Sequence, residues 1–236
     1  MIHRFEEAAL QPRKLAVAIA ILGVMAVCDS ARAQSARPSL PSPDSLPSVI
    51  PIFPLEDAML FPNAERPLHI FEARYRAMVA DALKDDRIIG MVTLKPGFEA
   101  DYEGRPPIHD IGCVGFITDV EELPGGEFNI LLRGVVKFRV VGEDQSRPYR
   151  LAKISVMPEP LDGGQRDALH KQRQRLELFL TRPGKDSAIP PVIPDEEIVD
   201  ALAQYVPIDP NERQALLELE GPLARSERLV RLLESK

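Results

Sequence analysis

The sequence contains no tryptophan, and aromatic residues make up only 6% of its 236 positions. This shortage argues against a carbohydrate-binding or base-stacking surface, because such surfaces rely on exposed aromatic rings. Positive charge is also scarce, since 29 lysine and arginine residues face 36 acidic ones and the net charge is −7. Proteins that bind nucleic acid duplexes carry a basic surface, so we expect no nucleic acid partner.

Cysteine is almost absent, with only Cys28 and Cys113 in the whole sequence. Cys28 falls within a segment that we expect to be removed, so no internal disulfide is available to the remaining chain. A core of this size does not need one. Cys113 lies in the apolar run at 111–117 with no nearby charge to lower its pKa, and we expect a buried, unreactive thiol.

Long hydrophobic runs are missing except for residues 15–27, which comprise 13 apolar residues. A membrane-spanning helix needs about 20. The run follows Arg13-Lys14 and precedes Ala31-Arg32-Ala33, a pattern typical of a secretory signal peptide. We predict a signal peptide over residues 1–33, cleaved after Ala33, and an exported, periplasmic protein. An uncleaved leader that anchors the chain to the membrane, lipid attachment at Cys28 and a misassigned start stay open as alternatives.

Proline, by contrast, is abundant, with 23 residues where an average chain of this length has about half as many. Residues 34–48 alone hold four prolines and five serines. Their apolar content is too low for packing, so this segment is predicted to be a flexible linker.

Residues 49–160 are predicted to form a β-rich unit. Short runs rich in valine, isoleucine and phenylalanine are bounded by glycine, proline and aspartate, which is typical of strands. The hairpin signal Leu123-Pro124-Gly125-Gly126 separates two of them. Lys137 and Arg139 fall on one face of their run and predict a strand with a solvent side. The predicted strands cover residues 49–55, 58–61, 67–70, 88–95, 111–120, 128–142 and 149–157.

Helical periodicity marks one segment within the β-rich unit and most of residues 161–236. In the first segment, residues 71–84, Phe71 and Tyr75 lead an apolar face. Asp209-Pro210 followed by Glu212 predicts a helix start with an aspartate N-cap. The later helices are predicted over residues 165–181, 195–206, 209–219 and 223–234. Segregation of strands and helices favours an α+β fold over a doubly wound sheet.

Motifs for common enzyme chemistry are missing from the sequence. It contains neither a G-x-x-x-x-G-K-[ST] phosphate-binding loop nor a G-x-S-x-G nucleophile elbow. His69, His109 and His170 are far apart and have no ligand partner at metal-binding spacing. We therefore predict no catalytic residues, no metal and no cofactor. His69 is interpreted as a packed or hydrogen-bonded structural histidine.

Residues 50–83 contain the blocks Pro51-Ile52-Phe53-Pro54-Leu55, Leu60-Phe61-Pro62 and Pro67-Leu68-His69-Ile70-Phe71-Glu72. With these blocks the segment resembles the start of the LON domain, the amino-terminal substrate-binding domain of Lon proteases, and most closely the stand-alone members found in small bacterial proteins. Weaker matches continue to residue 235, including Pro148-Tyr149. Asn63-Ala64 replaces a common glycine pair, and Ala73 replaces a common proline. The motif positions, which we interpret as mostly structural, are Pro54, Phe61, Pro62, His69, Phe71, Glu72, Arg74, Tyr75, Gly112 and Gly134.

The resemblance implies a PUA-like twisted β-barrel at 49–160 followed by a carboxy-terminal helical part at 161–236. In this arrangement Phe71 and Tyr75 are expected to anchor the first helix on the barrel, and Glu72 and Arg74 are expected to bind backbone or each other. The family binds polypeptides, so the resemblance also implies unfolded or degron-bearing polypeptides as partners, with a protease or chaperone as a further partner. We expect neither an ATPase module nor a protease domain with its Ser–Lys dyad.

Three hypotheses follow for the function. The leading one is a non-catalytic protein that binds polypeptide segments. The second is RNA binding, which PUA-like barrels often perform, although the acidic charge weighs against it. The third is a stand-alone peptidase or other hydrolase, whose nucleophile and base would have to meet from distant positions in the sequence.

Overall fold

A computed structural model of the chain describes residues 39–98, 104–180, 189–190 and 192–235. The predicted signal peptide and the first part of the predicted linker lie outside these residues, so cleavage and export stay predictions. None of the helices in the described ranges is both long enough and apolar enough to cross a membrane.

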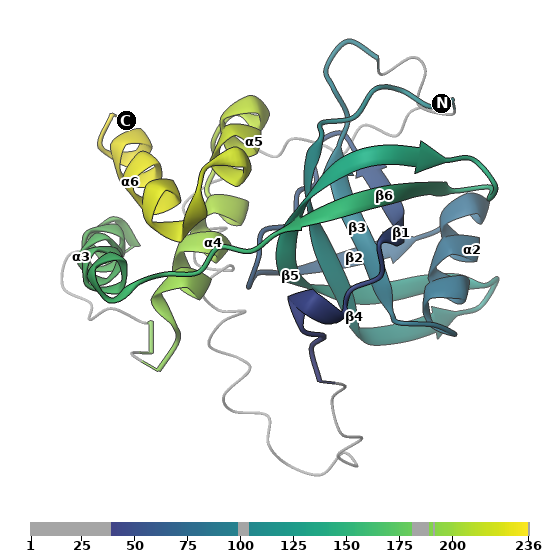
Figure 1. The fold of residues 1–236 in the computed structure, drawn as a ribbon, viewed down its shortest axis with the longest axis horizontal. Coiled ribbons are helices and arrows are strands. Elements are labelled where there is room, and N and C mark those ends of the chain that lie inside the picture. The colour runs from purple at the N-terminus through teal and green to yellow at the C-terminus, as the bar shows by residue number, and fades with distance from the viewer. Residues whose placement is uncertain (1–38, 99–103, 181–188, 191, 236) are drawn as a thin grey trace.

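Five strands form a closed, barrel-like ring, seen on the right in Figure 1. They are β1 (Val49–Leu55), β3 (Ile88–Thr93), β4 (Ile111–Leu123), β5 (Glu127–Asp144) and β6 (Arg150–Met157). β1 runs parallel to β3, and the other neighbours in the ring are antiparallel. Pairing of β5 with β6 closes the ring, while β2 (Glu65–Ile70) lies along the first half of β5.

Two motif glycines allow neighbouring backbones to approach closely in the barrel. A Cβ atom on Gly134 would lie 1.9 Å from the carbonyl oxygen of Phe61, and one on Gly112 would lie 2.3 Å from that of Met91. Both positions therefore require a residue without a side chain. The departure at Asn63 also has a physical reason, because its φ of 59° is a left-handed conformation in which asparagine replaces glycine most readily.

The predicted hairpin and first helix are confirmed. Gly125 and Gly126 have φ values of 96° and 77° in the turn that joins β4 to β5. Helix α2 (Ala73–Ala82) lies at the end of the barrel farthest from the other long helices (Figure 1). Its buried residues, Tyr75, Met78, Val79 and Ala82, pack against the barrel.

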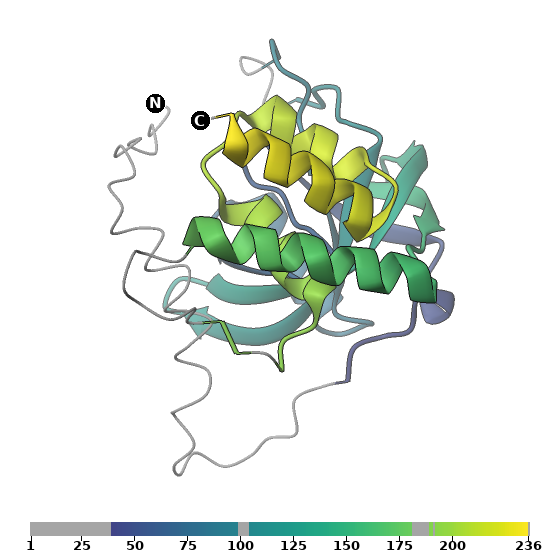
Figure 2. The same ribbon diagram turned by 90° about the vertical axis from the view of Figure 1, so that its left-hand side faces the viewer.

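A short 3-10 helix, η1 (Pro43–Ser45), precedes the barrel, and four helices follow it: α3 (Gly163–Leu180), α4 (Asp195–Tyr205), α5 (Pro210–Glu218) and α6 (Gly221–Glu234). Asp209 is the predicted N-cap of α5, since its Oδ1 accepts a 2.8 Å hydrogen bond from the Asn211 amide. Figure 2 shows α3 running across the helical part, where it packs beside α6. The predicted α+β fold, with a barrel followed by helices, is confirmed.

Three apolar clusters make up the core. One joins α2 to the barrel, and a second fills the ring around Ile50, Ile52 and Phe138. The third belongs to the helical part but also includes Met59, Phe61, Ala64 and Ile111 from the barrel side. The helices therefore complete their core with residues that the barrel supplies.

The predicted strand at 58–61 is wrong, although Met59, Leu60 and Phe61 are buried. Side chains replace the strand partner here. The Phe61 amide donates to Gln204 Oε1 at 3.0 Å, and the Met59 carbonyl accepts from Arg66 Nε at 2.6 Å. A buried segment whose backbone groups bond to side chains has the same apolar sequence pattern as a strand, but it pairs with no neighbouring strand.

The predicted solvent side of β5 is also wrong at one of its two positions. Arg139 is exposed, but Lys137 is only 2% exposed because the helical part covers this stretch of β5. The Lys137 ammonium donates to the Leu219 carbonyl at 2.5 Å and pairs with Glu159 at 2.6 Å. Lys137, which was expected to face solvent, is therefore buried between β5 and the helical part.

Candidate functional site

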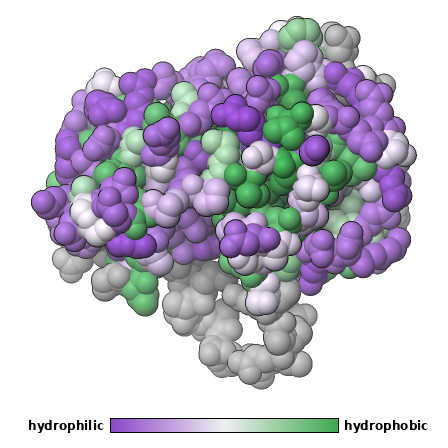
Figure 3. Space-filling model, in the orientation of Figure 1, coloured by the Kyte–Doolittle hydropathy of each residue, from purple (hydrophilic) through white to green (hydrophobic). Residues whose placement is uncertain are grey.

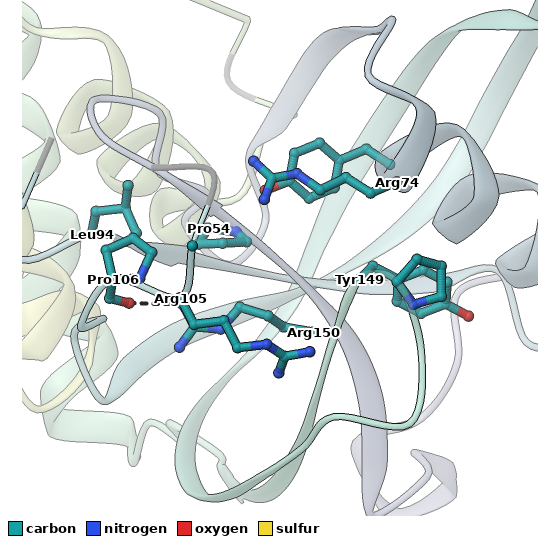
Figure 4. A pocket seen from close by; sticks show the side chains of 10 residues that line it. Pro54, Arg74, Leu94, Arg105, Pro106, Tyr149 and Arg150 are labelled. Atoms are coloured by element: carbon teal, nitrogen blue, oxygen red, sulfur yellow. Dashed lines mark hydrogen bonds between the residues drawn. The ribbon is translucent and has the colours of Figure 1, made fainter. Parts of the chain in front are cut away.

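An open cavity of about 280 Å³ lies on the barrel between the end of β1, the start of α2, the segment at 104–106 and the start of β6. Among the described residues, its lining contains three arginines, two tyrosines and three prolines, and no aspartate or glutamate. We call it the arginine cavity after Arg74, Arg105 and Arg150. Figure 4 shows Arg74 on one side of Pro54, and Arg105 and Arg150 on the other side in that view.

Arg150 is the most firmly held of the three. Its Nε and one terminal nitrogen each donate to the Glu143 carboxylate at 2.8 Å, which is the two-pronged geometry that arginine forms best. The other terminal nitrogen donates to the Pro106 carbonyl at 2.8 Å, the bond dashed in Figure 4. With only 8% of the residue exposed, the guanidinium is fixed in one orientation at the cavity wall.

Arg74 is placed by α2 and by the barrel. Its Nε donates to Glu72 at 3.0 Å, which confirms that these two motif residues bind each other. Its guanidinium lies over the Tyr75 ring, 4.6 Å from the centroid, and that ring tilts against Phe53 at 4.3 Å. The cation–π contact and the ion pair together keep the arginine at the cavity mouth.

Tyr149 and Arg105 complete the cavity. The Tyr149 hydroxyl donates to Asp81 at 2.9 Å, and burial, together with this bond to a carboxylate, raises the pKa of Tyr149. Arg105 is exposed, and its positive charge interacts with the Asp144 carboxylate. Hydrogen bonds from Ser146 lower the pKa of Asp144, so the carboxylate near Arg105 stays ionised at neutral pH.

A second hollow of about 370 Å³, the junction groove, lies where the barrel meets the helical part. Charged side chains form a chain of contacts along it. Lys137 pairs with Glu159 at 2.6 Å, Glu159 pairs with Arg225 at 3.1 Å, and Arg225 hydrogen-bonds Asp200. Asn63 closes the series with a 3.0 Å bond to Asp200. Lys137 lies on β5, Glu159 follows β6 and Asn63 precedes β2, whereas Asp200 and Arg225 lie on helices α4 and α6.

Burial dominates the electrostatics of this network. It raises the pKa of Asp200 to about 6, although Arg225 and the amide of Asn63 pull it back towards the usual range. Arg225 is fully buried, and its guanidinium also lies 5.4 Å from the centroid of the Phe61 ring. The charges of this network pair with one another within the junction, whereas Arg74 and Arg150 of the arginine cavity pair with Glu72 and Glu143, which lie outside the described cavity lining.

The structure brings part of the family motif together and separates the rest. Pro54, Arg74 and Tyr75 meet at the arginine cavity, together with Pro148 and Tyr149 from a weaker match. Phe61 and Pro62 lie instead at the junction with the helical part. Glu72 lies outside the cavity lining and orients Arg74.

The expected anchoring role of Phe71 is wrong. Tyr75 is buried, but Phe71 is 58% exposed because the helix begins only at Ala73 and Phe71 points away from the core. His69 lies beside it, with ring centroids 6.0 Å apart. The histidine is hydrogen-bonded, as expected, to Asn129 at 2.9 Å and lies 3.2 Å from Glu127, but it is half exposed and not packed in the core.

In the part of the chain that is described, hydroxyl and thiol groups bond to backbone, amide or carboxylate oxygens. There, no serine, threonine or cysteine shares a hydrogen bond with a histidine or lysine, and no three His, Cys, Asp or Glu residues are placed to hold a metal ion. Cys113 is a buried free thiol, as predicted, and burial raises its pKa far above the usual range.

Sequence reasoning did not single out Arg105, Arg150, Asp200 or Arg225. Arg105 and Arg150 had no detectable signal, because isolated arginines are ordinary surface residues. Arg225 did carry one. It lies four residues before Leu229 and eight before Leu233, on the apolar stripe of its helix, where an unpaired charge would be costly.

The chain is similar to proteins of one kind. Residues 49–235 match the family model described as the ATP-dependent protease La (LON) substrate-binding domain. The chain is 27% identical to Lon protease 2 of Myxococcus xanthus over 85% of its own length and 26% identical to a Lon protease of Anaeromyxobacter dehalogenans over 84%. It spans about a quarter of the length of these curated relatives.

Solved structures agree on the fold. The amino-terminal domain of a Mycobacterium avium complex Lon protease superposes with a TM-score of 0.60 at 15% identity, covering 79% of this chain and 98% of that domain. A Lon N-terminal domain protein from Xanthomonas campestris gives 0.54 at 22%, covering 78% and 97%. Both the barrel and the helical part lie within the family match, and the chain belongs to the LON substrate-binding domain family.

Proposed function

We propose that this chain is a non-catalytic polypeptide-binding protein that holds unfolded or degron-bearing segments. One observation carries the proposal: the match to a substrate-binding domain spans residues 49–235, and thus both the barrel and the helical part. A substrate-binding unit of this kind would therefore extend over the described fold from β1 to α6. The relatives that share this unit are proteases, and their proteolytic activity is no part of the proposal.

The surface supports this function. Figure 3 shows apolar residues gathered over the barrel on the face in view, whereas the helical part is mostly hydrophilic there. Exposed apolar side chains of the barrel include Val49 and Val141. Contiguous apolar surface of this kind is typical of a protein or peptide contact.

Binding can be tested with the full chain and a fluorescein-labelled polypeptide that is kept permanently unfolded by reduction and carboxymethylation. We expect fluorescence anisotropy to rise saturably with protein concentration for the unfolded client. The same client in its folded, disulfide-bonded form is the matched control and should give no rise. Equal responses to both forms, or no response to either, would overturn the proposal.

The non-catalytic part of the proposal needs a separate measurement. The same mixture is incubated with and without ATP and Mg²⁺, and the client is followed by mass spectrometry. We expect an intact client in both samples. Cleavage that survives repurification of the protein, and that a hydroxyl-directed inhibitor stops, would favour the hydrolase hypothesis instead.

We further propose that the protein acts after export. The support is the positive end, the apolar run at 15–27 and the small-residue site ending at Ala33. Cell fractionation followed by mass-spectrometric mapping of the amino terminus tests this directly. A mature chain that begins at Gln34 in the periplasm is expected, and an intact Met1 in the cytoplasm would contradict it.

A further inference from the structure

We propose that the arginine cavity binds a carboxylate of the polypeptide client, either the carboxy-terminal group or an acidic side chain. This inference rests on the proposed function and adds the chemical class that one site on the molecule selects. Arg74, Arg105 and Arg150 supply the positive charge, and the tyrosine and proline rings supply apolar walls.

The described lining of the cavity is basic, although the protein is acidic overall. The whole chain carries a net charge of −7, whereas the described residues that line this hollow include three arginines and no aspartate or glutamate. The acidic partners Glu72 and Glu143 lie outside this lining, where they orient the guanidinium groups of Arg74 and Arg150. A ligand carboxylate in the hollow would therefore meet guanidinium groups and no acidic side chain of the described lining.

The donors are already arranged for a planar anion. Arginine offers five N–H donors, and the described contacts of Arg150 to Glu143 and Pro106 use three of them. Because the same contacts fix the guanidinium plane, little side-chain entropy is lost when a ligand binds. A guanidinium held in this way recognises a carboxylate more specifically than a mobile lysine would.

Size argues for a small part of a polypeptide. A volume of about 280 Å³ lies just below the range of ligand-binding pockets, which is roughly 300–1,000 Å³. One or two residues fit such a space. The rings of Tyr75 and Tyr149, with Pro54, can contact the side chain next to the carboxylate, so the cavity suits a chain end better than the middle of a segment.

The junction groove provides an internal comparison. It is the larger hollow, and it also has cationic groups nearby, Lys137 and Arg225. There, however, Glu159 and Asp200 are part of the lining and pair with those cations at close range. In the junction groove a ligand carboxylate would meet the carboxylates of Glu159, Glu196 and Asp200, whereas the described lining of the arginine cavity contains none.

The test uses the full chain and three fluorescein-labelled versions of one short client peptide: with a free carboxy terminus, with an amidated terminus, and amidated with one glutamate near the end. We expect amidation to weaken binding about tenfold, as for the loss of a charge-assisted hydrogen bond. If the added glutamate restores affinity, the site accepts side-chain carboxylates; if it does not, the site reads the chain end.

Variants locate the site. Arg105→Gln changes an exposed residue, so the fold should be retained, and we expect about tenfold weaker binding of the free peptide together with loss of sensitivity to amidation. Arg175→Gln is the matched control, since it removes the same charge from an exposed ion pair with Glu234 in the helical part. Its affinity should equal that of the unchanged protein.

Failure of this inference is distinguishable from failure of the proposed function. If the unfolded client binds but amidation and Arg105→Gln change nothing, the function stands and the carboxylate site is overturned. The same holds if Arg175→Gln weakens binding as much as Arg105→Gln, because general charge would then explain the effect. If neither client nor peptide binds, both proposals fall.

Discussion

The barrel and the helical part bury their apolar residues in different ways. The barrel has a cluster inside its own ring and a second one beneath α2. The helical part has a single cluster and shares it with Met59, Phe61, Ala64 and Ile111 of the barrel side. A closed ring can be stable with few outside contacts, whereas four short helices depend on the surface that they cover.

The charged residues also differ between the junction of the two parts and the barrel surface. The buried ion network lies at the junction, with Lys137 and Glu159 on one side and Asp200 and Arg225 on the other. A buried charge without its partner is costly, so this network favours one relative placement of the two parts. The arginine cavity, by contrast, is lined by residues of the barrel and of the start of α2, and none of its described lining residues belongs to α3, α4, α5 or α6. The difference suggests that the junction specifies structure and the barrel surface binds.

The largest expected effect comes from removing Arg225. Arg225→Met leaves Asp200 buried without its guanidinium, and we expect the free energy of unfolding to fall by about 3–5 kcal/mol. Urea unfolding followed by circular dichroism measures it. Arg175→Met, which removes an exposed pair, is the control and should cost at most about 1 kcal/mol. Equal losses would mean that the stability of the junction depends on its charges no more than that of the surface does.

A smaller effect is expected at Gly134, where the barrel backbone contacts Phe61, a residue of the apolar cluster in the helical part. Gly134→Ala places a Cβ against the Phe61 carbonyl, and we expect a loss of roughly 1–3 kcal/mol from the forced backbone shift. Gly142→Ala on the same strand is the control, since nothing lies within 4 Å of the place that its Cβ would occupy. Its unfolding free energy should stay within about 0.5 kcal/mol of the unchanged protein.

Hydrogen exchange of the Gly134→Ala variant shows which part of the molecule loses stability first. Because Phe61 belongs to the cluster of the helical part, amides in α4 and α6 should lose protection before those of β3 and β4. Uniform loss across both parts would mean that the barrel and helices unfold as one unit.

Most elements of the fold could be predicted from the sequence, because period-2 and helical patterns, Gly-Gly turns and the Asp-Pro helix start act locally. The errors have a common cause. Residues 58–61 resemble a strand, Lys137 resembles a solvent-facing residue and Phe71 resembles a core residue, and tertiary contacts decide each of them. Arg66 and Gln204 supply the missing hydrogen bonds in the first case, and the helical part covers the strand in the second.

The candidate site was less predictable than the fold. Pro54, Arg74 and Tyr75 belong to the motif by resemblance, but nothing in their spacing shows that they meet Arg105 and Arg150 from distant segments. That meeting depends on the pairing of β1 with β6. A local sequence pattern predicts one element at a time, whereas the cavity is built from four separate segments of the chain, so such a pattern does not reveal it.

The smallest and most gradual effect is expected from pH, acting through Asp200. Its pKa in the folded protein is about 6, against an ordinary value of 3.8. Between these values the folded state holds a proton that the unfolded state has lost, so this group makes the protein more stable as pH falls from about 7 to 4. The gradient cannot exceed about 1.4 kcal/mol per pH unit, since one proton is involved.

Asp200→Asn isolates this contribution from those of other carboxylates, among them Asp144, whose lowered pKa acts in the opposite direction. We expect the stability of the unchanged protein relative to Asp200→Asn, measured by urea unfolding at several pH values, to increase as pH falls through 6. If it decreases instead, the attraction of Arg225 outweighs burial and Asp200 is ionised throughout. The junction would then be a permanent ion pair, and the two parts of the molecule would differ in the depth of their charges but not in how those charges titrate.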